Sequence, residues 1–230
     1  EKTRAAFFLQ LIPLYTQIVN ELVLAGAEWI QFEEPSLTKA LPEEEILIIE
    51  ELYKQIKEET PNANILVQTY FEALTSFERL TQLPVAGIGL DFVHGAKENL
   101  KALQKFGFPK NKTLSLGIIN GRDIWSANLA EVVSTIRTVK QLGQVEDLWI
   151  SSSCSLQHVP VSKDVEKKLS LELWDHLAFA DEKIREIAHI TYFIKKGEWL
   201  KEGIVKQSLQ VIEALATHPI RKNKDVLHAV

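Results

Sequence analysis

The sequence of 230 residues contains no methionine and a single cysteine, Cys154. One cysteine excludes an internal disulfide, and it fits a protein of the reducing cytoplasm. The missing methionine, absent even from position 1, leaves three interpretations open. These are a fragment, a processed chain, and modified residues omitted from the sequence.

The chain also lacks an excess of basic charge and a long hydrophobic run. Its net charge is −5 and its pI is about 5.8. These values argue against nucleic-acid binding, because phosphates require a basic face. No apolar run approaches the ~20 residues that span a bilayer, so we expect no membrane association. The first residues, EKTRAAFFLQLIPLY, predict an amphipathic helix and not a signal peptide, since no small-residue cleavage site follows them.

What the chain does contain is a regular alternation of strand and helix patterns. Apolar, strand-like runs are predicted at 28–34, 64–71, 85–93, 112–120 and 147–155. Helical spacing predicts helices at 4–25, 41–59, 75–82, 97–106 and 127–142, then a mostly helical chain from Lys163 with a break around Gly197. This alternation indicates a parallel sheet with right-handed crossovers. The continuous apolar runs predict strands that are covered on both faces.

The glycine motifs of nucleotide-binding sheets are absent from the sequence. Neither GxGxxG nor GxxxxGK[ST] follows any predicted strand, which favours a (β/α)8 barrel over a doubly wound sheet. Five strands cannot close an eight-stranded barrel. We therefore expect a partial α/β barrel of the (β/α)8 TIM-barrel type, with about five parallel strands and a helical carboxyl-terminal extension. An open sheet is the alternative, and residues 1–230 are expected to form a single domain.

Polar side chains gather at the carboxyl ends of the predicted strands, where parallel barrels place their chemistry. They are Glu33, Glu34, Thr69, Tyr70, Glu72, Asp91, His94, Asn120, Arg122, Asp123, Ser151–Ser153, Cys154 and His158. Each has a structural explanation as well. Strand-end acids often cap helices, lone loop histidines more often form hydrogen bonds than bind ligands, and Cys154 in SSSCSL fits a small buried residue. The Asn120-Gly121-Arg122 turn by itself indicates nothing.

Spacing gives no support for a metal site or a catalytic triad. The possible zinc ligands are Cys154, Asp91, His94 and His158, and no two of them have a tight ligand spacing such as CxxC. No GxSxG motif marks a nucleophilic serine.

Five segments, in this order, carry a resemblance to a known family. They are AEWIQFEEPSL, QTYFEAL, GLDFVHG, LSLGIINGRDIWSANL and LWISSSCSLQHVPV. Together they resemble the amino-terminal half of cobalamin-independent methionine synthase, and ELWDHLAFADEKIREI resembles the helices that follow in that family. The resemblance runs from about Lys2 to Ile187 and weakens beyond it.

The resemblance implies a parent enzyme of two (β/α)8 barrels that methylates homocysteine to make methionine. In this family the carboxyl-terminal barrel holds a zinc ion, which activates homocysteine as a thiolate. The methyl donor is 5-methyltetrahydrofolate with a polyglutamate tail. This chain resembles the latter part of the amino-terminal barrel. Its expected partner is therefore the carboxyl-terminal catalytic barrel, with both substrates bound at the level of the parent.

Because the two barrels of the family are similar in fold, the zinc-ligand positions of the catalytic barrel can be compared with this chain. At positions matching the catalytic ligands, Thr69 replaces a histidine, Phe71 a cysteine and Asp91 a glutamate, whereas Cys154 keeps a cysteine. Because Phe71 cannot bind metal, the resemblance implies no zinc and no cofactor in this chain. Glu33 stands where the catalytic barrel has an acid that meets the homocysteine amino group.

These observations predict a catalytically silent, supporting fragment of a cytoplasmic methyltransferase. No catalytic or metal-binding residue is expected in it, and the pocket candidates are Glu33, Asp91, Asn120 and Cys154. Two alternatives remain open. One is a related zinc-dependent thiol methyltransferase, and the other is a non-catalytic barrel that binds a small molecule.

Overall fold

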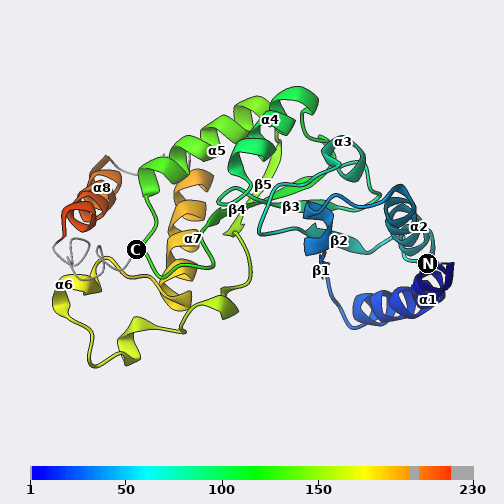
Figure 1. Ribbon diagram of the computed structural model, residues 1–230, viewed down its shortest axis with the longest axis horizontal. Coiled ribbons are helices and arrows are strands. Elements are labelled where there is room, and N and C mark those ends of the chain that lie inside the picture. Colours follow the sequence, from blue (N-terminus) through cyan, green and yellow to red (C-terminus); the bar gives the residue numbers. More distant parts are fainter. Residues whose placement is uncertain (1, 197–201, 219–230) are drawn as a thin grey trace. The chain divides into compact units, whose positions relative to one another are not determined.

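The computed structural model describes residues 2–196 and 202–218, with the elements shown in Figure 1. The strands are β1 (Trp29–Glu33), β2 (Asn64–Gln68), β3 (Gly87–Asp91), β4 (Thr113–Ile119) and β5 (Asp147–Ser152). The helices are α1 (Lys2–Leu24), α2 (Glu43–Glu59), α3 (Phe77–Leu80), α4 (Ala96–Phe106), α5 (Leu129–Gly143), α6 (Leu171–Trp174), α7 (Ala180–Lys195) and α8 (Glu202–Thr217). Short 3-10 turns lie at Pro35–Thr38, Leu156–His158 and Lys163–Val165.

Every predicted strand is present, but each is shorter than its apolar run. The clearest case is β2, which ends at Gln68 and not at Phe71. Phe71 has a φ of 81°, a left-handed conformation that cannot continue an extended strand. Helices were predicted well where the periodic stretch was long, as in α2, α4 and α5. The predicted break around Gly197 lies outside the described residues.

The five strands form one sheet in the order β1-β2-β3-β4-β5. β1 pairs in parallel with β2, with Trp29 opposite Asn64 and Glu33 opposite Gln68. The β2–β3 and β3–β4 pairs are parallel as well. Each crossover therefore moves one strand further in the same direction, as in a (β/α)8 barrel. The sheet is not closed, so the prediction of a partial α/β barrel is confirmed.

The chain forms two compact units. The first runs to Gly117 and includes Val139–Trp149, and the second comprises Ile118–Thr138 and the chain from Ile150 onward. The prediction of a single domain over 1–230 stays a prediction.

Burial along the strands follows their place in the sheet. Every residue of β3 and β4 is buried, and β2 is exposed only at Asn64. In contrast, β1 and β5 alternate between exposed and partly buried positions. The prediction that all strands are covered on both faces is therefore wrong for β1 and β5. These two strands are the first and the last in the order of the sheet.

A glycine on β3 makes room for a polar side chain from β2. Gln68 is buried, and its Nε2 donates to the carbonyl oxygen of Thr69 at 3.0 Å. A Cβ on Gly89 would lie 2.0 Å from Oε1 of Gln68. The Gln68 side chain thus occupies the space that a larger residue at position 89 would need.

The first helix, α1, packs on α2 and is apolar on both of its faces. Ile12 and Val19 are buried, whereas Phe7 and Leu14 are exposed. The window Ala6–Leu24 has a mean hydropathy of 1.4 and, by length and composition alone, could cross a membrane. The prediction that no apolar run approaches bilayer length is wrong in this sense, because the few polar residues that interrupt the run leave it apolar enough on average. Core helices and signal sequences meet the same criteria.

Candidate functional site

The two glutamates at the end of β1 have different surroundings. Glu33 is exposed, and its Oε1 accepts a hydrogen bond from Nε2 of Gln31 at 2.8 Å. Glu34 follows the strand, and its Oε1 accepts from the hydroxyl of Tyr53 at 3.2 Å. Tyr53 belongs to α2 and is 1% exposed. Glu34 therefore ties the end of β1 to α2 through Tyr53. Among the residues that the structure describes, its side chain makes no hydrogen bond that caps the following 3-10 turn, and Glu33 is exposed.

Burial changes the pKa values of Glu34 and Tyr53. Desolvation raises the pKa of Glu34 above its usual 4.5, and hydrogen bonds from Tyr53 and Ser36 oppose that rise. Burial beside the Glu34 carboxylate raises the pKa of the Tyr53 phenol well above 10.0. Both shifts favour neutral groups, which suits a structural contact in an apolar setting.

A pocket of about 580 Å³ lies between α1, β1 and α2. Its walls are mostly apolar, and the carboxylates of Glu33, Glu34 and Glu45 contribute to its lining. The apolar lining residues are Phe8, Leu11, Ile12, Tyr15, Phe32, Leu41, Ile48, Ile49 and Leu52. The volume lies within the range of small-molecule sites. The predicted pocket residue Glu33 thus does line a pocket of suitable size.

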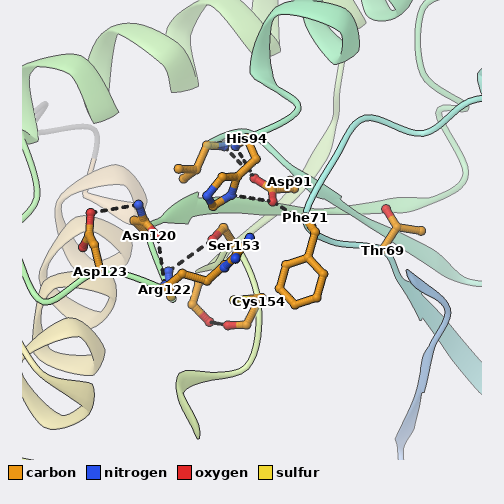
Figure 2. A network of polar contacts seen from close by, with 12 residues as sticks. Thr69, Phe71, Asp91, His94, Asn120, Arg122, Asp123, Ser153 and Cys154 are labelled. Atoms are coloured by element: carbon orange, nitrogen blue, oxygen red, sulfur yellow. Dashed lines mark hydrogen bonds and ion pairs between the residues drawn. The ribbon is translucent and has the colours of Figure 1, made fainter. Parts of the chain in front are cut away.

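Asp91, at the end of β3, is fully buried and accepts several backbone hydrogen bonds (Figure 2). Its Oδ1 accepts from the amides of Val93, at 2.7 Å, and His94, at 2.9 Å. Its Oδ2 accepts from the amide of Phe71 at 2.9 Å and lies 3.1 Å from Nδ1 of His94. Both carboxylate oxygens are therefore engaged by the loops that follow β2 and β3.

Asn99 on α4 extends this contact between the two loops. Its Nδ2 donates to the carbonyl oxygen of Asp91 at 2.9 Å, and its Oδ1 accepts from the amide of Leu74 at 3.2 Å. Thr69, at the end of β2, donates its hydroxyl to the carbonyl oxygen of Gly89 at 2.7 Å. We call Asp91, Asn99, Phe71 and His94 the Asp91 network. No sequence pattern marked Asn99, because a single polar residue in an amphipathic helix predicts an exposed position.

The residues at the positions that resemble a zinc site do not fit zinc. A structural or catalytic zinc needs about three or four His, Cys or carboxylate ligands. Over residues 2–196 and 202–218, no group of three or more such side chains could hold a metal. Asp91 is already engaged by three backbone amides, and the Phe71 ring has no ligand atom. The absence of zinc from this chain nevertheless stays a prediction.

In the second unit, Asn120 belongs to a closed turn after β4 (Figure 2). Its Nδ2 donates to Oδ2 of Asp123 at 2.8 Å, and its Oδ1 accepts from the amide of Arg122 at 2.9 Å. Asp123 is in turn 3.1 Å from Nζ of Lys183, a residue of α7 that is 1% exposed. Lys183 also donates to the carbonyl oxygen of Trp125 at 3.0 Å. This buried lysine was missed, because lysines on a charged helix predict exposed positions.

Cys154 is buried beside the same turn. The amide of Gly121 donates to Oγ of Ser153 at 3.1 Å, and a Cβ on Gly121 would lie 2.9 Å from Sγ of Cys154. Cys154 is 4% exposed. This environment matches the interpretation of Cys154 as a small buried residue.

The remaining candidates make local contacts or are exposed. The ring of Tyr70 packs edge-on against Phe71, with centroids 4.7 Å apart. Oγ of Ser152 donates to the carbonyl oxygen of Cys154 at 2.7 Å. Glu72 and His158 are exposed.

Comparison with known proteins decides the family. Residues 1–144, more than half of the chain, match the family described as "Cobalamin-independent synthase, N-terminal domain". This chain belongs to the cobalamin-independent methionine synthase family. Four of the five segments that carried the resemblance lie within these residues, and the fifth, LWISSSCSLQHVPV, follows them.

Curated relatives agree with this assignment. The chain is 41% identical over 223 residues to the 5-methyltetrahydropteroyltriglutamate–homocysteine methyltransferase of Bacillus cereus (strain G9842). It is 40% identical to the protein of the same name from Bacillus thuringiensis (strain Al Hakam). Each alignment covers 96% of this chain and 29% of the relative. The chain thus spans less than a third of the length of these relatives.

A solved structure supports the fold. The B12-independent methionine synthase from Shewanella sp. W3-18-1, solved in complex with selenomethionine, superposes with a TM-score of 0.50. The match covers 79% of this chain and 53% of that chain, at 17% sequence identity. At this identity, the likeness concerns the fold alone.

Proposed function

We propose that this chain is the supporting, non-catalytic part of a cytoplasmic methyltransferase. The complete protein would transfer a methyl group from 5-methyltetrahydrofolate polyglutamate to homocysteine, forming methionine. Zinc and the homocysteine thiolate would belong to the carboxyl-terminal barrel, which is the proposed partner of this chain. The names of the relatives and the 29% of their length that is covered support this proposal.

The proposal of a non-catalytic role rests on the hydrogen bonds that Asp91 accepts. A carboxylate that binds a metal or a substrate needs a free lone pair directed at it. In this chain, both Asp91 oxygens accept backbone amides. Asp91 therefore holds the two loops in place, and Nδ1 of His94 lies 3.1 Å from Oδ2, opposite its remaining acceptor position.

The contribution of this chain's own residues is loop positioning. The amide of Phe71, at the position where the family's catalytic barrel has a cysteine ligand, is bound by Asp91. Its φ of 81° is unfavourable for a phenylalanine and persists because the surrounding contacts define it. The loop after β2 is thus fixed in one conformation, which suits a surface that supports a neighbouring barrel.

An activity assay with a metal determination tests this proposal. The purified chain is assayed for methyl transfer to homocysteine with the folate triglutamate donor, and its zinc content is measured. The complete protein serves as the positive control. We expect no turnover and no stoichiometric zinc from the chain alone. Turnover, or one zinc per chain, would show that the chain is catalytic and the proposal wrong.

A second candidate function is small-molecule binding, and the pocket between α1, β1 and α2 favours it. Its apolar walls and the exposed carboxylate of Glu33 suit a ligand with an apolar body and an amine. Calorimetry with homocysteine, methionine and folyl polyglutamates separates the two candidates. Binding that is lost in Glu33→Gln and kept in Glu72→Gln supports this second function. Null results with all three ligands count against it.

A further inference from the structure

The second unit contains a smaller pocket with a different chemistry. Its volume is about 280 Å³, and it lies between α7, α8 and the residues that precede α5. Its lining includes Ser126, Asp175, Glu186, Ser208, Val211 and Ile212. Glu33, Asp91, Asn120 and Cys154 are not among its lining residues, so neither proposed function uses it.

Glu186 lines this pocket, and one of its two carboxylate oxygens is buried and unsatisfied. Its Oε1 accepts from the amide of Ala127 at 2.9 Å. Its Oε2 is buried and has no hydrogen-bond partner among residues 2–196 and 202–218. Because an unsatisfied buried polar atom is costly, this oxygen calls for a donor. Burial also raises the pKa of Glu186, which is the cost of leaving its charge unpaired.

The hydroxyl groups of the pocket cannot supply that donor. Oγ of Ser208 donates to the carbonyl oxygen of Ala127 at 3.0 Å and accepts from the amide of Leu129 at 3.1 Å. Oγ of Ser126 donates to the carbonyl oxygen of Asp175 at 3.3 Å. Each hydroxyl has one hydrogen, and both hydrogens are committed. The hydrogen-bonding positions of these hydroxyl groups that remain unused are therefore acceptors.

The cations nearby are engaged elsewhere. Nζ of Lys183 binds Asp123 and the carbonyl oxygen of Trp125. Nζ of Lys163 donates to the carbonyl oxygens of Trp174, at 2.7 Å, and Leu177, at 3.0 Å. Within the described part of the chain, neither lysine forms an ion pair with Glu186. The charges that act on Glu186 are those of Lys183, Lys163 and Asp123. The two lysines are balanced by the carboxylates of Asp123 and Glu186, so these four side chains carry no net positive charge.

We propose that this pocket binds a small primary alkylammonium ion. The ammonium group donates to Oε2 of Glu186, and its remaining hydrogens reach the Ser126 and Ser208 oxygens. A short aliphatic chain then lies against Val211 and Ile212. The volume of about 280 Å³ lies just below the range of drug-sized sites, which limits the ligand to a few carbon atoms. The described residues offer no group of three metal-ligating side chains here, so an organic cation suits the pocket better than a metal ion.

The test is calorimetry of the whole chain with n-butylammonium chloride as the probe. Tetramethylammonium and potassium chlorides are the controls, because both carry one positive charge and neither donates a hydrogen bond. We expect saturable one-to-one binding of butylammonium and none of either control. Glu186→Gln should weaken that binding about tenfold or more, because it removes a charge-assisted hydrogen bond. Glu131→Gln, an exposed glutamate of the same unit, is the matched control and should bind as the unchanged chain does.

A second variant keeps the test independent of the folding of Glu186→Gln. Val211→Trp fills the pocket and leaves the carboxylate, so it should also abolish butylammonium binding. Circular dichroism checks that each variant is folded. Absence of butylammonium binding, equal binding of tetramethylammonium or potassium, or unchanged binding in Val211→Trp would overturn the proposal.

Discussion

The indole rings of Trp29 and Trp149 pack edge to face, with centroids 4.5 Å apart and planes inclined at 62°. Trp29 begins β1 and Trp149 belongs to β5, the strands at the two edges of the sheet. The sheet is therefore curled enough for side chains from its opposite edges to meet. This contact links the two edges of a barrel that the strands present do not close.

The first prediction concerns this aromatic contact. Trp29→Leu and Trp149→Leu should each lower the free energy of unfolding, and the double variant should lose less than the sum. The expected coupling is about 0.5–1.5 kcal/mol, which is typical of an aromatic pair beyond its buried area. Urea unfolding followed by circular dichroism measures it. Strictly additive losses would show that the two rings do not stabilise each other.

The second prediction concerns the Asp91 network. In Asp91→Asn, the NH2 group of the new side chain faces a backbone amide that now donates a hydrogen bond to Asp91. We expect a loss of about 1–3 kcal/mol in the free energy of unfolding, the cost of a buried unsatisfied group. Urea unfolding is the measurement, and Glu72→Gln, an exposed acid in the same loop, is the control. A loss as small as that of the control would mean that Asp91 does not hold the loops.

The third prediction follows from the raised pKa of Glu34. Between pH 4.5, the usual value, and its raised pKa, the folded chain binds more protons at Glu34 than the unfolded chain does. Stability contributed by Glu34 therefore falls as the pH rises through this window. Glu34→Gln removes the titration and keeps an acceptor for Tyr53. The variant should be more stable than the unchanged chain near neutral pH, and this gain should fade as the pH falls toward 4.5.

Thermal melting across the pH range measures this difference. Glu33→Gln is the matched control, because Glu33 is the neighbouring glutamate and is exposed. Its effect should be small at every pH. A Glu34→Gln variant that is less stable at neutral pH than at acidic pH, relative to the unchanged chain, would contradict the sign predicted here.

The fourth prediction concerns the buried Lys183. Lys183→Met leaves Asp123 without its cation and the Trp125 carbonyl oxygen without its donor. Because the Asp123 side chain is 37% exposed, water offsets part of the loss. We expect a decrease of about 1–3 kcal/mol in the free energy of unfolding, below the full cost of breaking a buried pair. Combining it with Asp123→Asn should cost less than the two single losses together, and additive losses would argue against the pair.

Much of the fold could be predicted from the sequence, because its elements are long and regular. The apolar runs located all five strands, and their alternation with helices indicated the parallel order. Strand ends were less predictable. The apolar pattern continues through Phe71, whereas β2 ends at Gln68 and Phe71 has a left-handed backbone with its amide bound to Asp91.

The candidate site was predictable in part. Strand-end position identified Asp91 and Asn120, because the carboxyl ends of parallel strands share one edge of a sheet. Their partners Asn99 and Lys183 lie on helices, where sequence gives the polar character of a residue but not the direction it faces. The unsatisfied oxygen of Glu186 depends on the positions of α8 and the Ala127 amide, which no local pattern encodes.

The close approach of Gln68 to Gly89 has a consequence for how this sequence can vary. Since a Cβ at position 89 would lie 2.0 Å from Oε1 of Gln68, a larger residue there requires the end of the Gln68 side chain to move or Gln68 to be replaced. A library that randomises both should recover larger residues at 89 more often together with smaller residues at 68. Which residues are tolerated at position 89 therefore depends on the residue at position 68 of the adjacent strand.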